Sequence, residues 1–338
     1  MSFMILAELC DKGSSSLAQK DLLFDSGIYP VYGAAGEITK VDFFHQSKPY
    51  LGLIKDGAGV GRVMQLPANS SVIGTIQYLF PRENVDLKYL YYLIKYLDLG
   101  KSNTGATIPH IYFKDYKKRK VKVREYSEQK HIGQILELID SHLSTYKNVL
   151  DQYDLLIKSR FVELFGDVVL NTLNWPLVKL SDIAEYRIGL TYKPEAVSSS
   201  GTAVLRSGNI QNSQLCYEDT IYVDSKVEAK LLLKKHDILM CARNGSQSLV
   251  GKVALIENDI LNTTYGAFMM AISSKYYVYL FEYFRSQAFR RLISVGSTTT
   301  INQVTTKMLN SVVIPLPDID TVNRFALYHS QINKLKFA

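Results

Sequence analysis

Residues 128–167 read EQKHIGQILELIDSHLSTYKNVLDQYDLLIKSRFVELFGD and form the most regular segment of the chain. Apolar side chains recur here at alternating spacings of four and three, which is the heptad pattern of a helix packed along another helix. The members of this seam are Ile132, Leu136, Ile139, Leu143, Tyr146, Leu150, Tyr153 and Ile157. Ser127 with Glu128 suits a helix start and Gly166 a helix end. The pattern therefore predicts one spacer helix about 57 Å long, at about 1.5 Å per residue.

A second helix with an apolar stripe is expected at the C-terminus, after the segment VVIPLP at residues 312–317. Its apolar residues at helical spacing are Val322, Phe325, Tyr328, Ile332 and Leu335. We expect it to pair antiparallel with the long helix, through residues that include Phe325 and Ile332. Because it is the shorter of the two, part of the long seam stays uncovered, and another chain would cover that part.

The sequence contains an internal duplication, with one copy before and one copy after the expected long helix. Four short matches occur in the same order, residues 5–9 with 179–183, 29–38 with 201–210, 60–63 with 250–253, and 107–114 with 300–307. The offset rises from 172 to 190 between the second and third matches, so the copies differ most between residues 36–61 and 208–251. Duplication at this period predicts two domains on one scaffold. The pattern fits two different binding specificities, and equally a duplicated fold whose loops have drifted.

Each copy is expected to be mixed α/β. Short β-type runs at residues 72–80, 251–256 and 267–272 precede aromatic-rich helices at 85–99 and 276–293, whose aromatic faces we expect in the core. The predicted fold class is α/β, of the α+β kind, with two similar domains separated by long helices that pair as an antiparallel coiled coil. The expected boundaries are 1–125 for the first domain, 126–167 for the spacer helix, 168–317 for the second domain and 318–338 for the C-terminal helix, which looks short.

Composition and missing motifs exclude several classes of protein. The chain has 338 residues, 47% hydrophobic and 21% charged, which is typical of a soluble globular protein. It shows no apolar run long enough for a membrane span, no signal peptide and no C-x-x-C pair, so we expect a cytoplasmic protein without a cysteine metal site. No P-loop, methyltransferase tetrad or H-E-x-x-H motif occurs, and Arg62 replaces a glycine of the dinucleotide motif at 57–61. We therefore expect no catalytic residue, metal or cofactor in this chain.

The charge balance and two Gly-rich loops point to nucleic acid. Lys plus Arg number 39 against 32 Asp plus Glu, a net charge of +7, and a basic surface is the footprint of a nucleic-acid binder. Loops 55–62 and 243–252, with the neighbouring 206–209, combine glycines that let the backbone come close with polar side chains that reach phosphates and base edges. The candidate DNA-binding residues are Lys55, Arg62, Arg206, Asn209, Arg243, Asn244, Gln247 and Lys252. The alternative is that these are ordinary solvated loops.

A second candidate is the basic run KDYKKRKVKVR at residues 114–124, with seven basic residues in eleven. The other copy has KMLNSVVIPLP at this place, so the fold does not require the charge. We expect Lys117, Lys118 and Arg119 to contact the DNA backbone or an acidic partner surface. The alternative is that the run is a solvated edge. Neutralising them together with Lys120 should lower the salt dependence of DNA binding.

Taken together, these features resemble the specificity subunit of type I restriction–modification enzymes. The resemblance covers essentially the whole chain. It rests on the duplicated domain, each copy opening with LAEL or LSDI and carrying YPVYGAAGEI or DILMCARNGS followed by VGKVALI. It rests also on a Thr-Ile turn, a strand and a long helix with EQKHIGQILELID, and on the passage from FVELFGD to NWPLVKLSDI.

The resemblance implies a sequence-specific DNA-binding subunit with no catalytic role. Each domain would read one half of a bipartite double-stranded target. The helices would set the spacing and dock methyltransferase subunits, two in number, which carry S-adenosylmethionine. A translocase–nuclease subunit that uses ATP and Mg²⁺ would join for restriction. The short C-terminal helix departs from the family pattern and leaves the symmetry of methyltransferase docking open.

Three alternatives remain at this stage. One is the specificity module of another restriction-enzyme type, and the second is a non-catalytic scaffold for nucleic acid or protein. The third is a metal-dependent nuclease built on Glu228 and Lys230, whose spacing matches a common nuclease motif only weakly.

Overall fold

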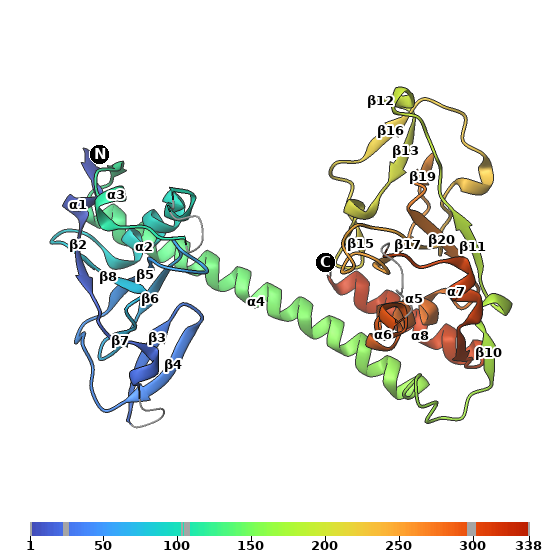
Figure 1. The fold of residues 1–338 in the computed structure, drawn as a ribbon, viewed down its shortest axis with the longest axis horizontal. Helices are drawn as coiled ribbons and strands as arrows, with labels where there is room; N and C mark the ends of the chain where they lie inside the picture. The colour runs from blue at the N-terminus through green and yellow to red at the C-terminus, as the bar shows by residue number, and fades with distance from the viewer. Residues whose placement is uncertain (1, 23–26, 103, 105–108, 296–301, 337–338) are drawn as a thin grey trace. The chain divides into compact units, whose positions relative to one another are not determined.

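The computed structural model describes residues 2–22, 27–102, 104, 109–295 and 302–336. The chain separates into two compact units, Met1–Lys147 and Asn148–Ala338, and one continuous 40-residue helix, α4 (Tyr126–Phe165), contributes to both (Figure 1). We call the elements before α4 domain 1 and those after it, up to β21, domain 2. The predicted single long helix is confirmed. It ends as expected at Gly166, which has the left-handed φ of 72° that glycine adopts without strain.

Domain 1 is built on two sheets and a covering helix. The larger sheet has the order β2-β8-β5-β6, all antiparallel, with β2 at Cys10–Ser14, β8 at Ile76–Pro81, β5 at Tyr50–Ile54 and β6 at Val63–Leu66. The smaller has the order β4-β3-β7, with β4 at Gly36–Val41, β3 at Tyr29–Gly33 and β7 at Ser71–Val72. Every residue of β5 is buried, and α2 (Leu87–Leu97) packs its Leu90 and Ile94 into the same core. Short helices α1 (Leu6–Leu9) and α3 (Phe113–Tyr116) flank a two-stranded pairing of β1 (Ser2–Ile5) with β9 (Lys120–Val123).

Domain 2 repeats this plan. Its larger sheet has the order β11-β20-β17-β18, with β11 at Glu185–Ile188, β20 at Met269–Ser273, β17 at Ile238–Cys241 and β18 at Val253–Leu255. Its second sheet has the order β12-β16-β13-β19, with β12 at Val197–Ser198, β16 at Ile221–Val223, β13 at Thr202–Leu205 and β19 at Thr263–Tyr265. A pairing of β10 (Leu177–Lys179) with β21 (Val313–Pro315) matches that of β1 with β9. The short helix α7 (Thr306–Ser311) precedes β21, as α3 precedes β9.

The predicted duplication is confirmed by hydrogen bonds that recur in both domains. Ile54 and Cys241 end the central strands, and each exchanges backbone hydrogen bonds with the paired loop end, Gly61 and Arg62 in domain 1, Gly251 and Lys252 in domain 2. The extra length of the second copy lies where the offset places it. It holds the hairpin of β14 (Ile210–Gln211) and β15 (Gln214–Leu215) and the loop that follows β16.

The expected helix at residues 276–293 is wrong in one respect, because it is two helices. The helix α5 (Tyr277–Arg285) ends at Ser286, whose backbone is extended, and α6 (Gln287–Val295) follows. The Ser286 hydroxyl accepts a hydrogen bond from the backbone N–H of Phe289 at 3.2 Å, so it caps the second helix. The apolar periodicity continues across this break and therefore did not reveal it.

The first turn of α4 is fixed to domain 1 by the side-chain amide of Gln129, which is buried. Its oxygen accepts from the backbone N–H of Asp86 at 3.0 Å, and its nitrogen donates to the carbonyls of Asn84 and Arg124 at 3.2 and 2.9 Å. Further along, Lys95 of α2 pairs with Asp140 at 2.8 Å. The seam residue Ile132 packs against the core of domain 1. Ile132, which the sequence places in a helix or subunit interface, is thus half-buried within domain 1.

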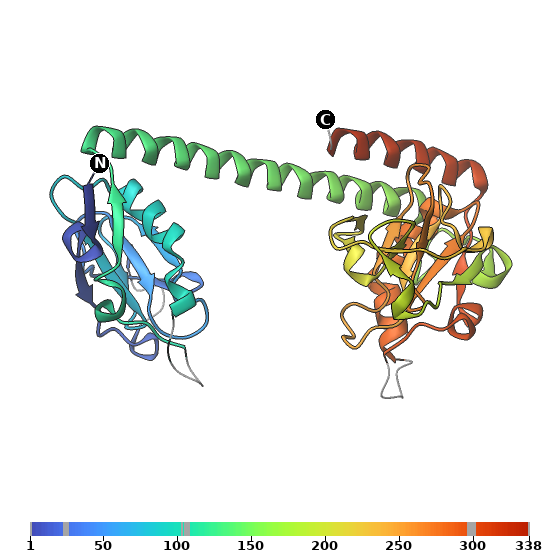
Figure 2. The ribbon, with the colours of Figure 1, turned by 90° about the horizontal axis from the view of Figure 1, so that it is seen from above.

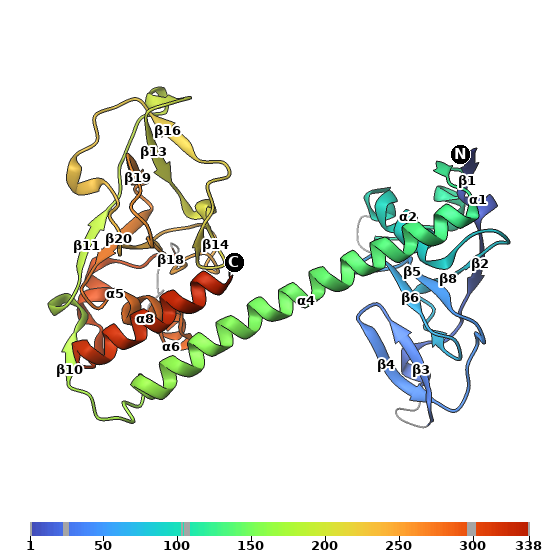
Figure 3. The same ribbon diagram turned by 180° about the vertical axis from the view of Figure 1, so that it is seen from behind.

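The C-terminal helix α8 (Ile319–Lys336) lies along the end of α4 in the antiparallel sense that the seam predicts (Figures 2 and 3). Phe325 contacts the rings of Phe161 and Phe165 at centroid distances of 5.6 and 5.3 Å, and Lys336 pairs with Asp154 at 2.6 Å. Residues later in α8 therefore contact residues earlier in α4, as antiparallel packing requires. The seam residue Ile157 joins Phe325 and Ile332 in the core of domain 2, and Tyr153 packs at its edge.

The middle of the seam is exposed to solvent. Leu143 and Tyr146 are 62% and 69% exposed, and Ile139 and Leu150 are also exposed, whereas Leu136 is half-buried. Leucine and tyrosine side chains at heptad spacing on an exposed helix face are typical of a docking surface. The exposed seam, defined here as Ile139, Leu143, Tyr146 and Leu150, matches the expectation that part of the long helix stays uncovered.

Candidate nucleic-acid interface

The β17–β18 loop of domain 2 is held in place by its backbone. The amides of Ala242 and Arg243 both donate to the carbonyl of Phe268, at 2.9 and 3.0 Å. From the other side, the Val304 amide donates to the Ala242 carbonyl at 2.8 Å, and Arg243 and Gln303 form an isolated β-bridge. These contacts fix the position of the Arg243 Cα from two directions.

The Arg243 side chain is exposed and oriented. The Gln303 side-chain oxygen accepts hydrogen bonds from Nε and Nη2 of Arg243, at 3.2 and 2.8 Å. The guanidinium carbon lies 5.7 Å from the centroid of the Phe268 ring, within reach of a cation–π contact, and Phe268 is itself 60% exposed. The result is a fixed arginine fork beside an exposed aromatic ring.

Asn244 ties this loop to two other segments. Its side-chain nitrogen donates to the Ser207 hydroxyl at 3.1 Å, and its side-chain oxygen accepts from the Ser246 amide at 3.0 Å. The Asn302 side chain donates to the Gly245 carbonyl at 3.3 Å. Three chain segments therefore present polar side chains on one surface.

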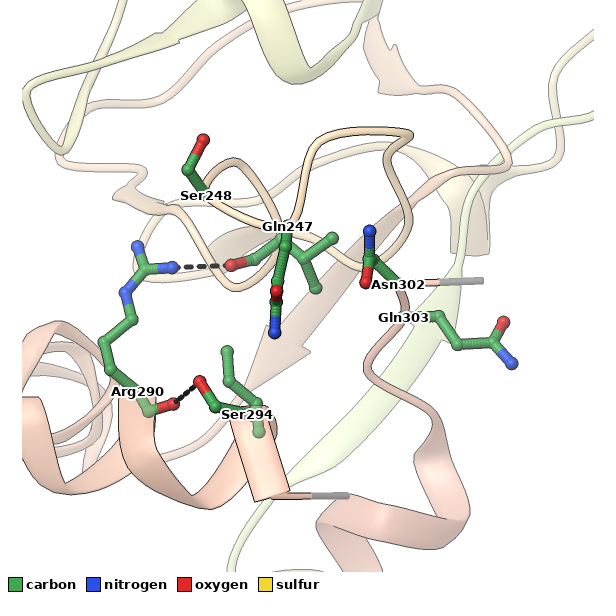
Figure 4. Close-up of a pocket in the computed structure, with 8 residues that line it drawn as sticks. Gln247, Ser248, Arg290, Ser294, Asn302 and Gln303 are labelled. Carbon is green, nitrogen blue, oxygen red and sulfur yellow. Dashed lines mark hydrogen bonds between the residues drawn. The ribbon is translucent and has the colours of Figure 1, made fainter. Parts of the chain in front are cut away.

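Next to this surface lies a hollow of about 410 Å³. Gln247 and Asn302 face the hollow from two segments, and Arg290 and Ser294 of α6 line its other side, while Gln303 points away (Figure 4). Arg290 donates to the Val250 carbonyl at 2.6 Å and so closes the loop against α6. Gln247 and Ser248 are the exposed loop residues that line this hollow.

Three other candidates of domain 2 are bound within the protein. Asn209 is 2% exposed, and its amide donates to the carbonyls of Cys216 and Glu218 at 2.9 and 3.1 Å. This corrects the expectation that Asn209 contacts DNA, because its donors already shape the loop. Arg206 donates to the Asp219 carbonyl at 3.0 Å and Lys252 to the Ile210 carbonyl at 3.1 Å, so each is partly engaged.

The equivalent loop of domain 1 has opposite chemistry. Asp56 stands where Arg243 stands, because it forms the matching isolated bridge with His110, and the Ile111 amide donates to the Lys55 carbonyl as Val304 does to Ala242. Lys55 pairs with Asp56 at 2.5 Å, and Arg62 donates to the Ala34 carbonyl. Both predicted DNA contacts of this loop are thus engaged with protein groups.

Gly61 shows why this loop is rich in glycine. It has φ +85°, and a Cβ there would lie 2.1 Å from the Gly100 nitrogen. The glycine therefore allows close approach of the protein's own turn at Leu99–Ser102, whereas the sequence suggested close approach to a ligand or DNA.

The basic run alternates along β9. Lys120 and Lys122 are exposed while Val121 and Val123 are buried, as period-two alternation requires. Lys118 is also exposed and Lys117 is half-buried. Arg119 donates to the Leu97 carbonyl at 3.0 Å and to the Ser102 hydroxyl, so it serves the fold rather than a free surface. Free positive charge in this run is therefore carried by lysines.

The nuclease alternative finds no support in the described part of the chain. Glu228 pairs with its neighbour Lys230 at 2.8 Å. No group of three or more His, Cys, Asp or Glu among the described residues could hold a metal ion.

The described residues also contain no helix with the length and apolarity needed to cross a bilayer. The Thr-Ile turns, Thr107 with Ile108 and Thr300 with Ile301, lie outside the described residues.

Comparison with known proteins agrees with this duplicated architecture. The family model described as the type I restriction modification DNA specificity domain matches residues 1–152 and 173–327. The chain belongs to this family. It is thus a specificity subunit, a non-catalytic component of a restriction–modification system, as the sequence predicted.

Two curated relatives and one solved structure are similar to this specificity subunit. The type I restriction enzyme MjaVIII specificity subunit of Methanocaldococcus jannaschii is 22% identical over 311 residues, covering 84% of this chain and 72% of the relative. The StySPI specificity subunit of Salmonella potsdam is 25% identical over 154 residues, 43% of this chain and 33% of the relative. The crystal structure of the S subunit from M. genitalium has a TM-score of 0.64 at 17% identity, covering 99% of this chain and 91% of that one, so the two share a fold.

Sequence reasoning missed Phe268, Asn302, Gln303 and Asp56. Each contacts a residue that is distant in the sequence, as Gln303 contacts Arg243 sixty residues away. One signal was present, since the offset of 193 that relates the Thr-Ile matches also aligns His110 with Gln303.

Proposed function

We propose that this specificity subunit reads a bipartite double-stranded DNA target, with each domain contacting one half. The observation that carries the proposal is the pair of equivalent loops. Two domains of one fold hold Asp56 and Arg243 at the same backbone position, beside His110 and Gln303. Equal scaffolds with unlike side chains at one loop position suit two different recognition tasks. The net charge of +7 favours binding to the polyanionic backbone of DNA.

The helices set the distance between the two halves and dock two methyltransferase subunits. The exposed seam supplies the apolar surface for docking. The methyltransferases bring S-adenosylmethionine, and a translocase–nuclease subunit brings ATP and Mg²⁺. The complex acts on DNA in the cytoplasm. The two recognition domains span residues 1–125 and 168–317, the boundaries predicted from sequence.

Co-expression with an adenine methyltransferase subunit from the same genome tests the proposal. We expect a stable complex on size exclusion and adenine methylation at a split motif with a fixed gap. A complex that forms but methylates no defined motif contradicts the proposed reading. Failure to form any complex favours a scaffold with other partners.

The exposed seam gives a sharper prediction. Replacing Leu143 and Tyr146 together with glutamate places charges in the proposed docking surface, so we expect at least a tenfold loss of methyltransferase affinity, equivalent to about 1.4 kcal/mol. Size exclusion and titration calorimetry measure this loss. The matched control is Leu155→Glu, an equally exposed leucine (57%) of α4 outside the heptad. Equal loss in the control, or none in the double variant, removes the seam from the interface.

A further inference from the structure

We infer that Arg243 reads a guanine in the major groove and that Gln303 is the residue that positions it. The inference rests on the proposed function and adds to it the identity of one base and of the group that reads it. It follows from three observations on the described residues, namely the hydrogen-bond geometry of Arg243, the charge at the equivalent site of domain 1, and the exposed ring of Phe268.

The first observation concerns which edge of the guanidinium is in use. Gln303 accepts from Nε and Nη2, which is the side edge. The end edge, formed by Nη1 and the second hydrogen of Nη2, has no partner among the described residues. That edge presents two parallel N–H groups, which is the geometry that matches O6 and N7 of guanine. Gln303 therefore occupies one edge and leaves the base-reading edge open.

The second observation separates base reading from phosphate binding. The two domains share a fold, so equivalent loop positions meet equivalent parts of the DNA in each half-site. A position that binds phosphate through its side chain needs a hydrogen-bond donor, and the same need holds in both half-sites because phosphates are the same in every sequence. Asp56 at the matching position is paired with Lys55 at 2.5 Å and so offers a phosphate neither a positive charge nor a side-chain donor. The opposite charges suit a position where the two halves meet different bases.

The third observation concerns order. Two hydrogen bonds to Gln303 hold the Arg243 fork, backbone hydrogen bonds to Phe268 hold its loop, and the Phe268 ring lies 5.7 Å from the guanidinium carbon. A free arginine loses rotamer freedom when it binds a base, and this arginine has already lost part of it. Phe268, at 60% exposure, also leaves an apolar ring open to solvent beside the fork.

The experiment is selection of bound sequences from a randomised double-stranded DNA library, using the full chain with its co-purified methyltransferase. The wild type, Arg243→Lys and Arg243→Ala are compared. Lysine keeps the charge but not the fork. We expect both variants to lose guanine preference at one position of one half, by roughly 5- to 150-fold, and to keep the other half unchanged.

Gln303 has its own readout. Gln303→Leu removes the acceptor and should relax the same guanine position, while Gln303→Glu keeps an acceptor and should restore the preference. A merely structural residue would change binding to all sequences alike. Fluorescence of Trp175, the one tryptophan, checks that each variant is folded.

The outcomes separate this inference from the function it rests on. A wild type that selects no split motif overturns the proposed function. A wild type that selects a motif, with Arg243→Lys unchanged or uniformly weaker on all sequences, leaves the proposed function standing and overturns the inference, because the fork of Arg243 then reads no base.

Discussion

Replacing Phe325 with alanine is expected to lower the free energy of unfolding of the second unit by about 3–5 kcal/mol. Phe325 is 0% exposed, and its ring packs on Phe161 and Phe165, so its removal leaves a cavity where α8, α4 and domain 2 meet. The measurement is urea unfolding followed by the fluorescence of Trp175, which lies in this unit.

Leu327→Ala provides the matched control for this substitution. Leu327 lies on the same helix but is 64% exposed, so the change should stay within about 0.5 kcal/mol of the wild type. Equal destabilisation by the two substitutions would show that α8 does not use Phe325 to hold the unit together, and the pairing of the two helices would lose its main support.

Replacing Lys118, Lys120 and Lys122 with glutamine is expected to reduce the salt dependence of DNA binding. Each lysine that neutralises a phosphate contributes about 0.9 to the slope of log K against log salt, so the slope should fall by about 2.7. These three are chosen because they are exposed, whereas Arg119 is bonded within domain 1. Fluorescence anisotropy of a labelled duplex over a salt series measures the slope.

A triple variant of Lys20, Lys147 and Lys158 removes the same charge from exposed positions outside the basic run. It should leave the slope near the wild-type value. If the two triple variants lower the slope equally, the basic run has no special place on the DNA. An unchanged slope in the first variant would make the run a solvated edge or a protein contact.

The long helix and the duplication could be predicted from sequence because both signals are local or linear. Heptad spacing is visible within one segment, and repeated motifs keep their order. The residues that cover the seam could not be predicted, because the spacing of apolar residues shows which face of a helix is apolar but not what packs against it. Ile132 faces the core of domain 1 and Ile157 that of domain 2, although both occupy the same heptad stripe.

The site was predicted less completely than the fold. Composition marks a polar loop residue as a DNA candidate, but it does not distinguish an exposed Arg243 from a buried Asn209. That difference depends on contacts between segments far apart in the chain. The break between α5 and α6 at Ser286 could not be predicted either, because the helical apolar spacing continues on both sides of it.

The central claim is that each domain reads its own half of one target. Exchange of residues 1–125 for the same segment of a relative with a known motif tests it most directly, with genome-wide mapping of methylated adenine as the measurement. The account predicts that one half of the split motif changes to that of the donor, while the other half is retained. A motif that changes in both halves, or in neither, would contradict it.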